Sequence, residues 1–473
     1  MTWKTSHYTH AMDLDDGKGL LYNGRTGAIV ELTPNVFQKV RSLLDLRSPI
    51  DEPPEGAQIR EVFSHLVAGG FLVRMDTDEL SLLEETYETE RRRSQFLLTI
   101  LPTFGCNLGC DYCFVGKKKG MMSLDTQRNI VDFVAKHIAA NSVPSMNVDW
   151  FGGEPLLSLP VVENLSREFI KICRSSGIPY HSQVITNGTV IGPDTVRVLR
   201  RSKVQRLQIT IDGPASLHDE RRPYKAGHAS SFQAIMAGLP LVVGKFLIRL
   251  RINVDNRNLN SVWPLLQLFA NKGWLGPDTQ FFPYLARISP FTEACSTMSN
   301  FVCSMDDFYQ VQFRWMERLE EFGVPVSAQG LYQFPEPKTY NCGAVGANGF
   351  VFTPEGEIHK CGLAVDNSRE AIGHVGQPLD SQQANLRKWQ EYSPFRNEVC
   401  RDCEFLPTCL GGCPRNQIEM REVQKKENCT YHKKFENQIL LFHLGHRSAI
   451  SKHLEQIPAT GAVDSSKLFP ILN

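Results

Sequence analysis

The sequence predicts an α/β fold whose central part is an open, partial barrel of six strand–helix repeats, a partial (βα)6 arrangement. Strand-like apolar segments recur at residues 96–102, 148–153, 182–188, 206–213, 246–255 and 280–286. Helix-like segments fill the gaps between them, at residues 125–140, 158–175, 192–202, 229–243 and 259–271. Parallel strands require such crossover connections, so the alternation indicates one parallel sheet. Ligands are expected at the carboxyl ends of its strands.

Residues 1–94 are expected to form a small separate domain. Residues 23–27 carry the glycines of a hairpin turn between the segments LLYNG and GAIVEL. One helix is expected from Thr33, with Pro34 at its first position. A second helix is expected at about residues 59–68, before the strand-like segment FLVRM. This order of strands and helices is typical of a winged-helix-like fold.

The barrel is expected to span residues 95–330. Beyond it, residues 331–435 are rich in cysteine and glycine and show little periodicity. Such composition predicts a loop-rich domain that is held together by metal rather than by a large core. A charged amphipathic helix at about residues 431–456 is expected to close the chain, so that residues 436–473 form a terminal helix and tail.

The overall composition is that of an ordinary globular protein. The chain has 473 residues, 51 basic and 51 acidic side chains, and 42% hydrophobic residues. Balanced charge leaves no electrostatic signal for nucleic acid or an anionic membrane. The first residues lack a signal peptide, and no apolar run is long enough to span a bilayer. We therefore expect a cytoplasmic protein without a nucleic-acid or membrane partner.

The thirteen cysteines are grouped. Three lie at positions 106–113 and seven lie between positions 342 and 429, whereas Cys173, Cys295 and Cys303 stand alone. Because cytosolic thiols remain reduced, grouped cysteines indicate metal rather than disulfides. The three isolated cysteines are expected to be small buried side chains.

The first group has the pattern Cys106-x3-Cys110-x2-Cys113 and follows the first barrel strand. Three thiolates on one loop can hold three irons of a [4Fe–4S] cluster, which leaves the fourth iron open. Structural zinc is the second interpretation, but it would normally recruit a fourth ligand at short spacing.

This loop, with the aromatic Tyr112 before its third cysteine, resembles the signature of the radical S-adenosylmethionine (SAM) superfamily. In that family the open iron binds the methionine part of the cofactor. An electron from the cluster then gives a 5′-deoxyadenosyl radical that abstracts a hydrogen atom from substrate. The resemblance implies a TIM-like partial barrel, a [4Fe–4S] cluster, SAM, and an electron donor such as flavodoxin or ferredoxin.

The second barrel strand ends in Gly152-Gly153-Glu154-Pro155, which resembles the family's GGEP motif. Glycines permit close approach of the backbone. The resemblance implies that backbone carbonyls and the Glu154 carboxylate receive the ammonium group of the cofactor. A glycine turn after a strand is the alternative reading.

Three further residues at or near strand ends are cofactor-binding candidates. Asn187 lies in Thr-Asn-Gly, where a turn asparagine is the alternative. Thr210, in QITIDGP, resembles the hydroxyl residue that meets the ribose in the peptide-modifying branch of the family. Arg222 ends an element that resembles HDxxR, which implies a clamp on the cofactor carboxylate; a surface ion pair is the alternative.

The second cysteine group resembles the seven-cysteine SPASM pattern, a domain with two auxiliary [4Fe–4S] clusters. The family's ligation implies that one cluster is held by Cys400, Cys403, Cys409 and Cys429, and the other by Cys342, Cys361 and Cys413. The fourth ligand of the latter is left open: the iron is free for substrate, or Cys295 or Cys303 reaches it. A zinc ribbon is the alternative for Cys400 to Cys413.

Enzymes with this combination mostly modify peptides or proteins. The N-terminal domain resembles the winged-helix leader-binding domains of peptide maturases, which bind a peptide as an added strand. We therefore expect a maturase of a ribosomally made precursor peptide that installs a thioether or carbon–carbon cross-link. Alternatives are a sulfatase maturase that forms formylglycine, another radical SAM oxidase, and, more remotely, a non-catalytic metal-stabilised peptide-binding protein.

Overall fold

The computed structural model describes residues 2–15, 17–44, 49–50, 57–115, 120–227, 229–276, 278–290, 292–324, 336–419 and 422–445. The chain divides into two compact units. The first comprises Met1–Arg91, Gly330–Cys342 and Tyr392–Asn473, and the second comprises Arg92–Gln329 and Gly343–Glu391. The division after Arg91 lies close to the expected boundary at residue 94. Part of the expected cysteine-rich domain, in contrast, belongs to the unit of the barrel.

Six parallel strands form the centre of the second unit. They pair in sequence order: β6 (Phe96–Ile100), β7 (Met146–Trp150), β8 (Tyr180–Thr186), β9 (Arg206–Thr210), β10 (Leu247–Val254) and β11 (Phe281–Arg287). The helices that follow or connect them are α4 (Leu124–Ala140), α5 (Leu159–Ser176), α6 (Pro193–Arg201), α7 (Ala215–Arg221), α8 (Ser231–Gly238), α9 (Trp263–Asn271) and α10 (Met305–Glu321). This arrangement confirms the predicted α/β fold and its six strand–helix repeats.

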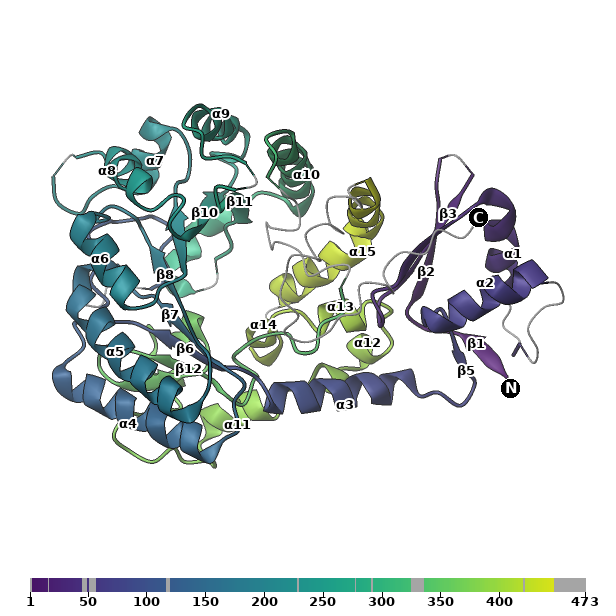
Figure 1. Cartoon of the computed structure of the whole chain (residues 1–473), viewed down its shortest axis with the longest axis horizontal. Helices are drawn as coiled ribbons and strands as arrows, with labels where there is room; N and C mark the ends of the chain where they lie inside the picture. Colours follow the sequence, from purple (N-terminus) through teal and green to yellow (C-terminus); the bar gives the residue numbers. More distant parts are fainter. Residues whose placement is uncertain are drawn as a thin grey trace. The chain divides into compact units, whose positions relative to one another are not determined.

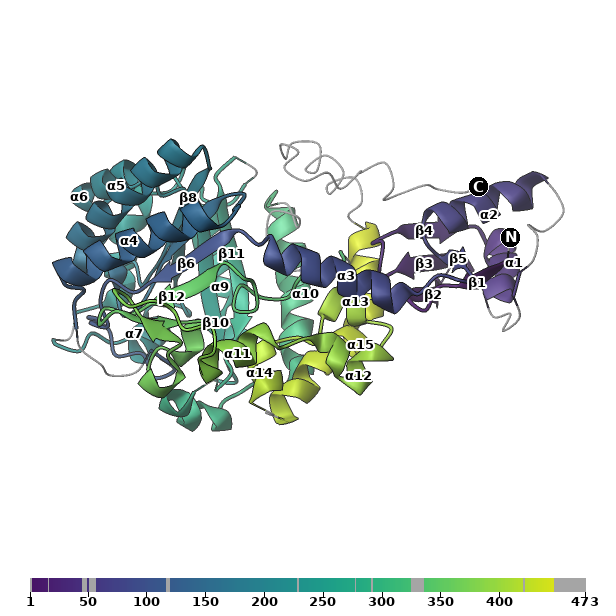
Figure 2. The ribbon, with the colours of Figure 1, turned by 90° about the horizontal axis from the view of Figure 1, so that it is seen from below.

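The two faces of this sheet differ in chemistry. Along β10, Ile248, Leu250 and Ile252 are fully buried, whereas Arg249 and Arg251 between them are only partly buried. Successive side chains of a strand point to opposite faces. Helices α4, α5 and α6 lie along one side of the strands in both views (Figures 1 and 2). The apolar face therefore packs beneath helices, and the other face carries polar side chains.

Three strands that the sequence did not predict extend the sheet beyond β6. β12 (Gly349–Phe352) pairs parallel to β6 and is followed by the antiparallel strands β13 (Glu357–His359) and β14 (Gly373–His374). Gly349 packs against Gly343 so closely that a Cβ atom at position 349 would lie within 3.0 Å of its carbonyl oxygen. These pairings explain why the segment that ends with α11 (Ala384–Gln390) belongs to the barrel unit.

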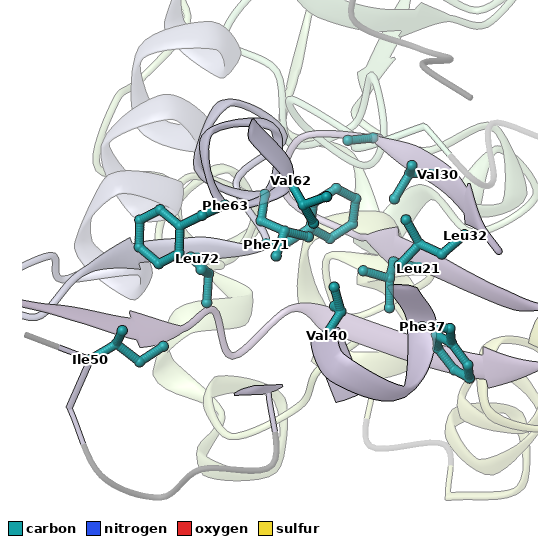
Figure 3. Packing of buried hydrophobic residues seen from close by; sticks show 12 residues of the cluster. Leu21, Val30, Leu32, Phe37, Val40, Ile50, Val62, Phe63, Phe71 and Leu72 are labelled. Atoms are coloured by element: carbon teal, nitrogen blue, oxygen red, sulfur yellow. The ribbon is translucent and has the colours of Figure 1, made fainter. Parts of the chain in front are cut away.

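The N-terminal part of the first unit has a core of its own. Its strands are β1 (Trp3–Thr5) paired with β5 (Leu72–Arg74), and an antiparallel sheet of β2 (Thr9–Asp13), β3 (Gly19–Asn23) and β4 (Ile29–Leu32). Its helices are α1 (Pro34–Leu44), α2 (Ala57–Ala68) and α3 (Glu79–Arg92). Figure 3 shows the buried side chains that join β3, β4, β5, α1 and α2, among them Leu21, Val30, Phe37, Val62 and Leu72. The predicted hairpin and both predicted helices are present.

The C-terminal part of the same unit is mostly helical. Its helices are α12 (Glu398–Arg401), α13 (Leu406–Cys409), α14 (Pro414–Ile418) and α15 (Glu422–Gly445). The last helix begins before the expected start at Tyr431, because the preceding segment, VQKKE, consists mainly of good helix formers. Its expected end near residue 456 lies outside the described residues. Among the residues described, no helix is long and apolar enough to cross a membrane.

The N-terminal core makes a testable prediction about local stability. Leu72 is 1% exposed, whereas Leu82 on α3 is 45% exposed. Leu72→Ala is expected to destabilise the N-terminal part by about 2–5 kcal/mol, through lost burial and a residual cavity. Leu82→Ala is expected to cost no more than about 0.5 kcal/mol. Hydrogen exchange of the β1 and β5 amides in the full chain measures the difference, and equal exchange in the two variants would contradict it.

Candidate active site

The loop that carries Cys106, Cys110 and Cys113 follows β6 and is braced by a second segment. The backbone N–H of Gly109 donates to the carbonyl of Pro223 at 2.8 Å, and the N–H of Lys225 donates to the carbonyl of Asn107 at 2.9 Å. Leu108 and Tyr224 form an antiparallel bridge between these bonds. The backbone that presents the thiols is therefore held on one side by residues 223–225.

The end of β7 holds the same loop from the other side. A Cβ atom at Gly153 would lie within 3.0 Å of the carbonyl oxygens of Phe104 and Gly105. The N–H of Glu154 donates to the Gly105 carbonyl at 2.8 Å. Gly152 has a φ of +119°, a conformation that side chains rarely adopt. Both glycines of the predicted motif are therefore required by the close packing of two strand ends.

Glu154 is fully buried and its carboxylate is fully engaged by the protein. Oε1 accepts hydrogen bonds from the Thr186 hydroxyl at 2.8 Å and the Leu156 N–H at 2.9 Å. Oε2 accepts from the Asn187 N–H at 2.7 Å. Burial raises the pKa of Glu154, and these hydrogen bonds oppose the rise. The carboxylate thus fixes the end of β8 to the end of β7, and its expected contact with an ammonium group stays a prediction.

Asn187 connects β8 to the cysteine loop. Its Nδ2 donates to Asn107 Oδ1 at 2.8 Å and lies 3.7 Å from Cys106 Sγ. Its Oδ1 accepts from the backbone N–H of Thr189 at 2.9 Å, as a turn asparagine does. The residue therefore combines the local turn role with a contact to the first cysteine.

Tyr112 joins the cysteine loop to the ends of β9 and β10. Its hydroxyl donates a hydrogen bond to the Asp212 carboxylate and accepts one from the Arg222 guanidinium. Asn253 Nδ2 also donates to this hydroxyl, at 3.2 Å. The guanidinium of Arg221 lies 5.5 Å from the centre of its ring. Burial, together with the Asp212 charge, raises the pKa of Tyr112, so the hydroxyl stays protonated.

Arg222 is 6% exposed, and one N–H group of its guanidinium can bond a further acceptor. Among the described residues, no acceptor bonds its buried Nε. Burial raises the pKa of the Cys110 thiol to about 11, and the Arg222 charge opposes that rise. A buried guanidinium with an unused N–H beside a cysteine ligand suits an incoming carboxylate. The thiols and Arg222 therefore fit the iron–sulfur cluster and the cofactor that the sequence implies.

A set of ion pairs that the sequence did not predict lies behind this site. Asp255, at the end of β10, bonds Arg221 at 2.8 Å and Arg257 at 2.6 Å. Arg257 also bonds Asp111, inside the cysteine loop, at 2.7 Å. The only signal in the sequence was the acidic residue at a strand end, which does not reveal its partners. Thr210, the remaining candidate, ends β9, is buried, and pairs in register with Arg251.

Four of the seven C-terminal cysteines line one cavity. Its walls contain Cys400, Cys403, Cys409 and Cys429 together with apolar side chains and Lys433. Burial raises the pKa values of Cys403 and Cys409, the latter to about 11. The four cysteines that the family resemblance grouped thus line one cavity, with Cys429 supplied by α15.

The other three C-terminal cysteines are distributed over both units. Asn341 Nδ2 donates to the carbonyls of Leu410 at 2.8 Å and Gly412 at 3.1 Å, which holds the chain before Cys342 against the chain before Cys413. Cys361 follows β13 in the barrel unit. Within the described part of the chain, no three His, Cys, Asp or Glu side chains converge on a single metal ion.

The isolated cysteines are buried, as expected. Cys173 and Cys295 are 2% exposed and Cys303 is fully buried. The Cys295 thiol donates to the Thr292 carbonyl at 3.3 Å and packs with Ile288 and Met298. Its surroundings are those of a structural side chain.

Comparison with known proteins identifies the barrel. Residues 100–238 match the family model described as the Radical SAM superfamily. A serine-type anaerobic sulfatase-maturating enzyme of Bacteroides thetaiotaomicron is 22% identical over 353 residues, which cover 66% of this chain and 81% of that enzyme. An AdoMet-dependent heme synthase of Methanosarcina barkeri is 25% identical over 340 residues, which cover 65% of this chain and 88% of that enzyme.

Solved structures share the fold. The structure described as native anSMEcpe with bound AdoMet and Kp18Cys peptide aligns with a TM-score of 0.56 and 20% identity. The alignment covers 73% of this chain and 99% of that one. This likeness extends the agreement in fold over nearly the whole of that protein.

The contact between Gly153 and the cysteine loop predicts a specific loss of cluster binding. Gly153→Ala is expected to push the loop away and to lower the iron content of the anaerobically reconstituted protein. Gly192→Ala is the control, since a Cβ atom there meets nothing within 4 Å. Iron analysis and the visible absorption of the cluster measure the effect. Equal iron in both variants would show that the loop tolerates the added methyl group.

His218 predicts how stability depends on pH. It is fully buried, its Nδ1 accepts from the Asp212 N–H at 3.1 Å, and burial lowers its pKa to about 4. Between about pH 6.5 and 4 the unfolded chain binds a proton that the folded chain does not, so stability falls as pH drops through this window. His218→Asn keeps an acceptor but cannot titrate. Its melting temperature should fall less steeply over the same window; an identical pH profile would exclude His218 as the cause.

Proposed function

We propose that this chain, a radical SAM enzyme with its radical SAM domain at residues 100–238, modifies a ribosomally made peptide and installs a cross-link in it. The structure of the N-terminal part of the chain is the observation that carries the proposal. It has its own core and an antiparallel sheet in which, within the described residues, β2 and β4 each pair on one side only. An extended peptide gains backbone hydrogen bonds by joining such an edge.

The part of this chain that lies outside the sequence matches supports a function that the sulfatase-maturating relative does not share. The sulfatase-maturating relative is matched over 81% of its own length but only 66% of this chain. About a third of this chain therefore has no counterpart in the match. A domain that holds a leader peptide would account for part of that additional length.

In this proposal Cys106, Cys110 and Cys113 hold the cluster that initiates the reaction. When bound, the cluster and SAM supply the one-electron chemistry that removes a hydrogen atom from an unreactive C–H bond. Arg222 holds the cofactor carboxylate, and Tyr112 orients Arg222 through its hydroxyl. Asn187 donates toward Cys106, and Glu154 keeps the strand ends that carry these groups together. Thr210 would meet the ribose of the cofactor.

The auxiliary clusters are assigned to the C-terminal cysteines. The cavity lined by Cys400, Cys403, Cys409 and Cys429 offers four thiols, which is a complete ligand set for one [4Fe–4S] cluster. Cys342, Cys361 and Cys413 would hold the second cluster, and its fourth position stays open in this proposal. Flavodoxin or ferredoxin would supply the electrons.

Sulfatase maturation is the second candidate, because several relatives are named anaerobic sulfatase-maturating enzymes. Converting a serine to formylglycine removes two hydrogen atoms, as cross-linking does, so a mass change alone does not separate these reactions. Formylglycine carries an aldehyde that reacts with a hydrazine reagent, whereas a thioether or carbon–carbon cross-link does not.

The test uses the full chain, reconstituted with iron and sulfide without oxygen, plus SAM, reduced flavodoxin and the short peptides encoded beside its gene. We expect 5′-deoxyadenosine and a peptide that has lost two hydrogen atoms and does not react with hydrazine. Cys110→Ala is expected to abolish both products, whereas the buried Cys173→Ala is expected to retain them. Hydrazine-reactive product from a serine- or cysteine-containing sulfatase peptide, with none from the neighbouring peptides, would replace this proposal by the second candidate.

A further inference from the structure

Two arginines stand side by side on the polar face of the barrel sheet. Arg249 and Arg251 alternate along β10 with fully buried aliphatic residues and are themselves partly buried. Their guanidinium carbons lie 5.1 and 6.0 Å from the centre of the Tyr284 ring on the neighbouring strand β11. Stacking on an aromatic face orients a guanidinium without using its N–H groups.

Arg251 lies next to the proposed initiation site. It pairs in register with Thr210 on β9 and with Tyr284 on β11. Its Nε donates to Asn253 Oδ1 at 2.7 Å, and Asn253 Nδ2 donates to the Tyr112 hydroxyl at 3.2 Å. Two hydrogen bonds therefore connect Arg251 to the cysteine loop, and they leave both of its Nη atoms available.

Arg251 differs from Arg221 and Arg257 in the carboxylate partners of its guanidinium group. Arg221 and Arg257 each bond Asp255 directly. Across the residues with described positions, Arg251 forms no ion pair with a carboxylate. Burial lowers the pKa of Arg249, and the positive charges of Arg206 and Arg251 add to this. A partly buried cation such as Arg251 is costly unless an anion joins it.

We infer that Arg251, assisted by Arg249, binds a carboxylate of the substrate peptide beside the C–H bond that reacts. The inference rests on the proposed function, because it assumes a peptide on this face of the sheet. Arg222, beside Cys110, is already assigned to the cofactor carboxylate, which leaves Arg251 for a second one. The planar fork of an arginine matches a carboxylate with two parallel hydrogen bonds. An Asp or Glu side chain, or the chain end, supplies that group.

The test measures binding rather than turnover. The probes are pools of fluorescein-labelled decapeptides with amidated ends and a central residue fixed as Asp, Glu, Asn or Gln, and one Asn pool with a free carboxyl end. Anisotropy is measured with the reconstituted protein and SAM. We expect a carboxylate to tighten binding about tenfold over the matching amide, as one charge-assisted contact would. A preference for the free carboxyl end alone would assign the same site to the chain terminus.

Three variants make the test specific. Arg251→Gln is expected to remove the preference, and Arg251→Lys, which keeps the charge without the fork, to retain part of it. Arg201→Gln is the control, since Arg201 is an exposed arginine on helix α6 rather than on this face of the sheet, and it should retain the preference. Melting temperatures establish that all three variants fold.

Two results would overturn the inference. One is equal binding of acid and amide pools by the unchanged protein, or an undiminished preference in Arg251→Gln. The other is a loss of SAM affinity in Arg251→Gln that matches the loss of peptide affinity, because Arg251 would then serve the cofactor. An acid preference without 5′-deoxyadenosine from any peptide would instead count against the proposed function and leave this binding site standing.

Discussion

The close approach of Gly153 to the carbonyls of Phe104 and Gly105 is the contact on which the rest of the site depends. It brings the end of β7 against the cysteine loop that follows β6. Glu154, the next residue, then reaches the end of β8 with its buried carboxylate. Three consecutive strand ends are thereby fixed relative to one another by backbone packing and one acidic side chain. A larger residue at position 153 would separate all three.

Polar and charged side chains join the ends of β9 and β10 to the cysteine loop. Tyr112 bonds Asp212 and Arg222 from the β9 side and Asn253 from the β10 side. Arg257 continues the chain of contacts from Asp255 back to Asp111 in the cysteine loop. Buried ionic groups of this kind stabilise little by themselves, but they strongly penalise any arrangement in which one partner is missing. Here they restrict where the thiols can lie.

The sequence was sufficient to predict what depends on local pattern. Alternating apolar segments located six parallel strands, and the resemblance of the cysteine pattern to a known family grouped the quartet that lines one cavity. It could not predict β12 to β14, because these strands are short and gain their stability from pairing: β12 pairs with β6, β13 with β12, and β14 with β13. Nor could it pair Arg257 with Asp111, which are 146 positions apart. The hydrogen bonds of the Glu154 carboxylate depend on partners that only the fold supplies, and its expected role in cofactor binding stays a prediction.

The first compact unit combines residues 1–91 with residues 392–473, so both segments must be synthesised before it can form. His10 on β2 bonds Glu436 on α15 at 2.9 Å and lies 5.0 Å from the Phe405 ring, between ring centres. Cys429, the last residue of the quartet, is on the same helix as Glu436. During translation the N-terminal strands therefore leave the ribosome long before their C-terminal partners exist, while the barrel can already fold. This unit can therefore be completed only after α15 has been synthesised.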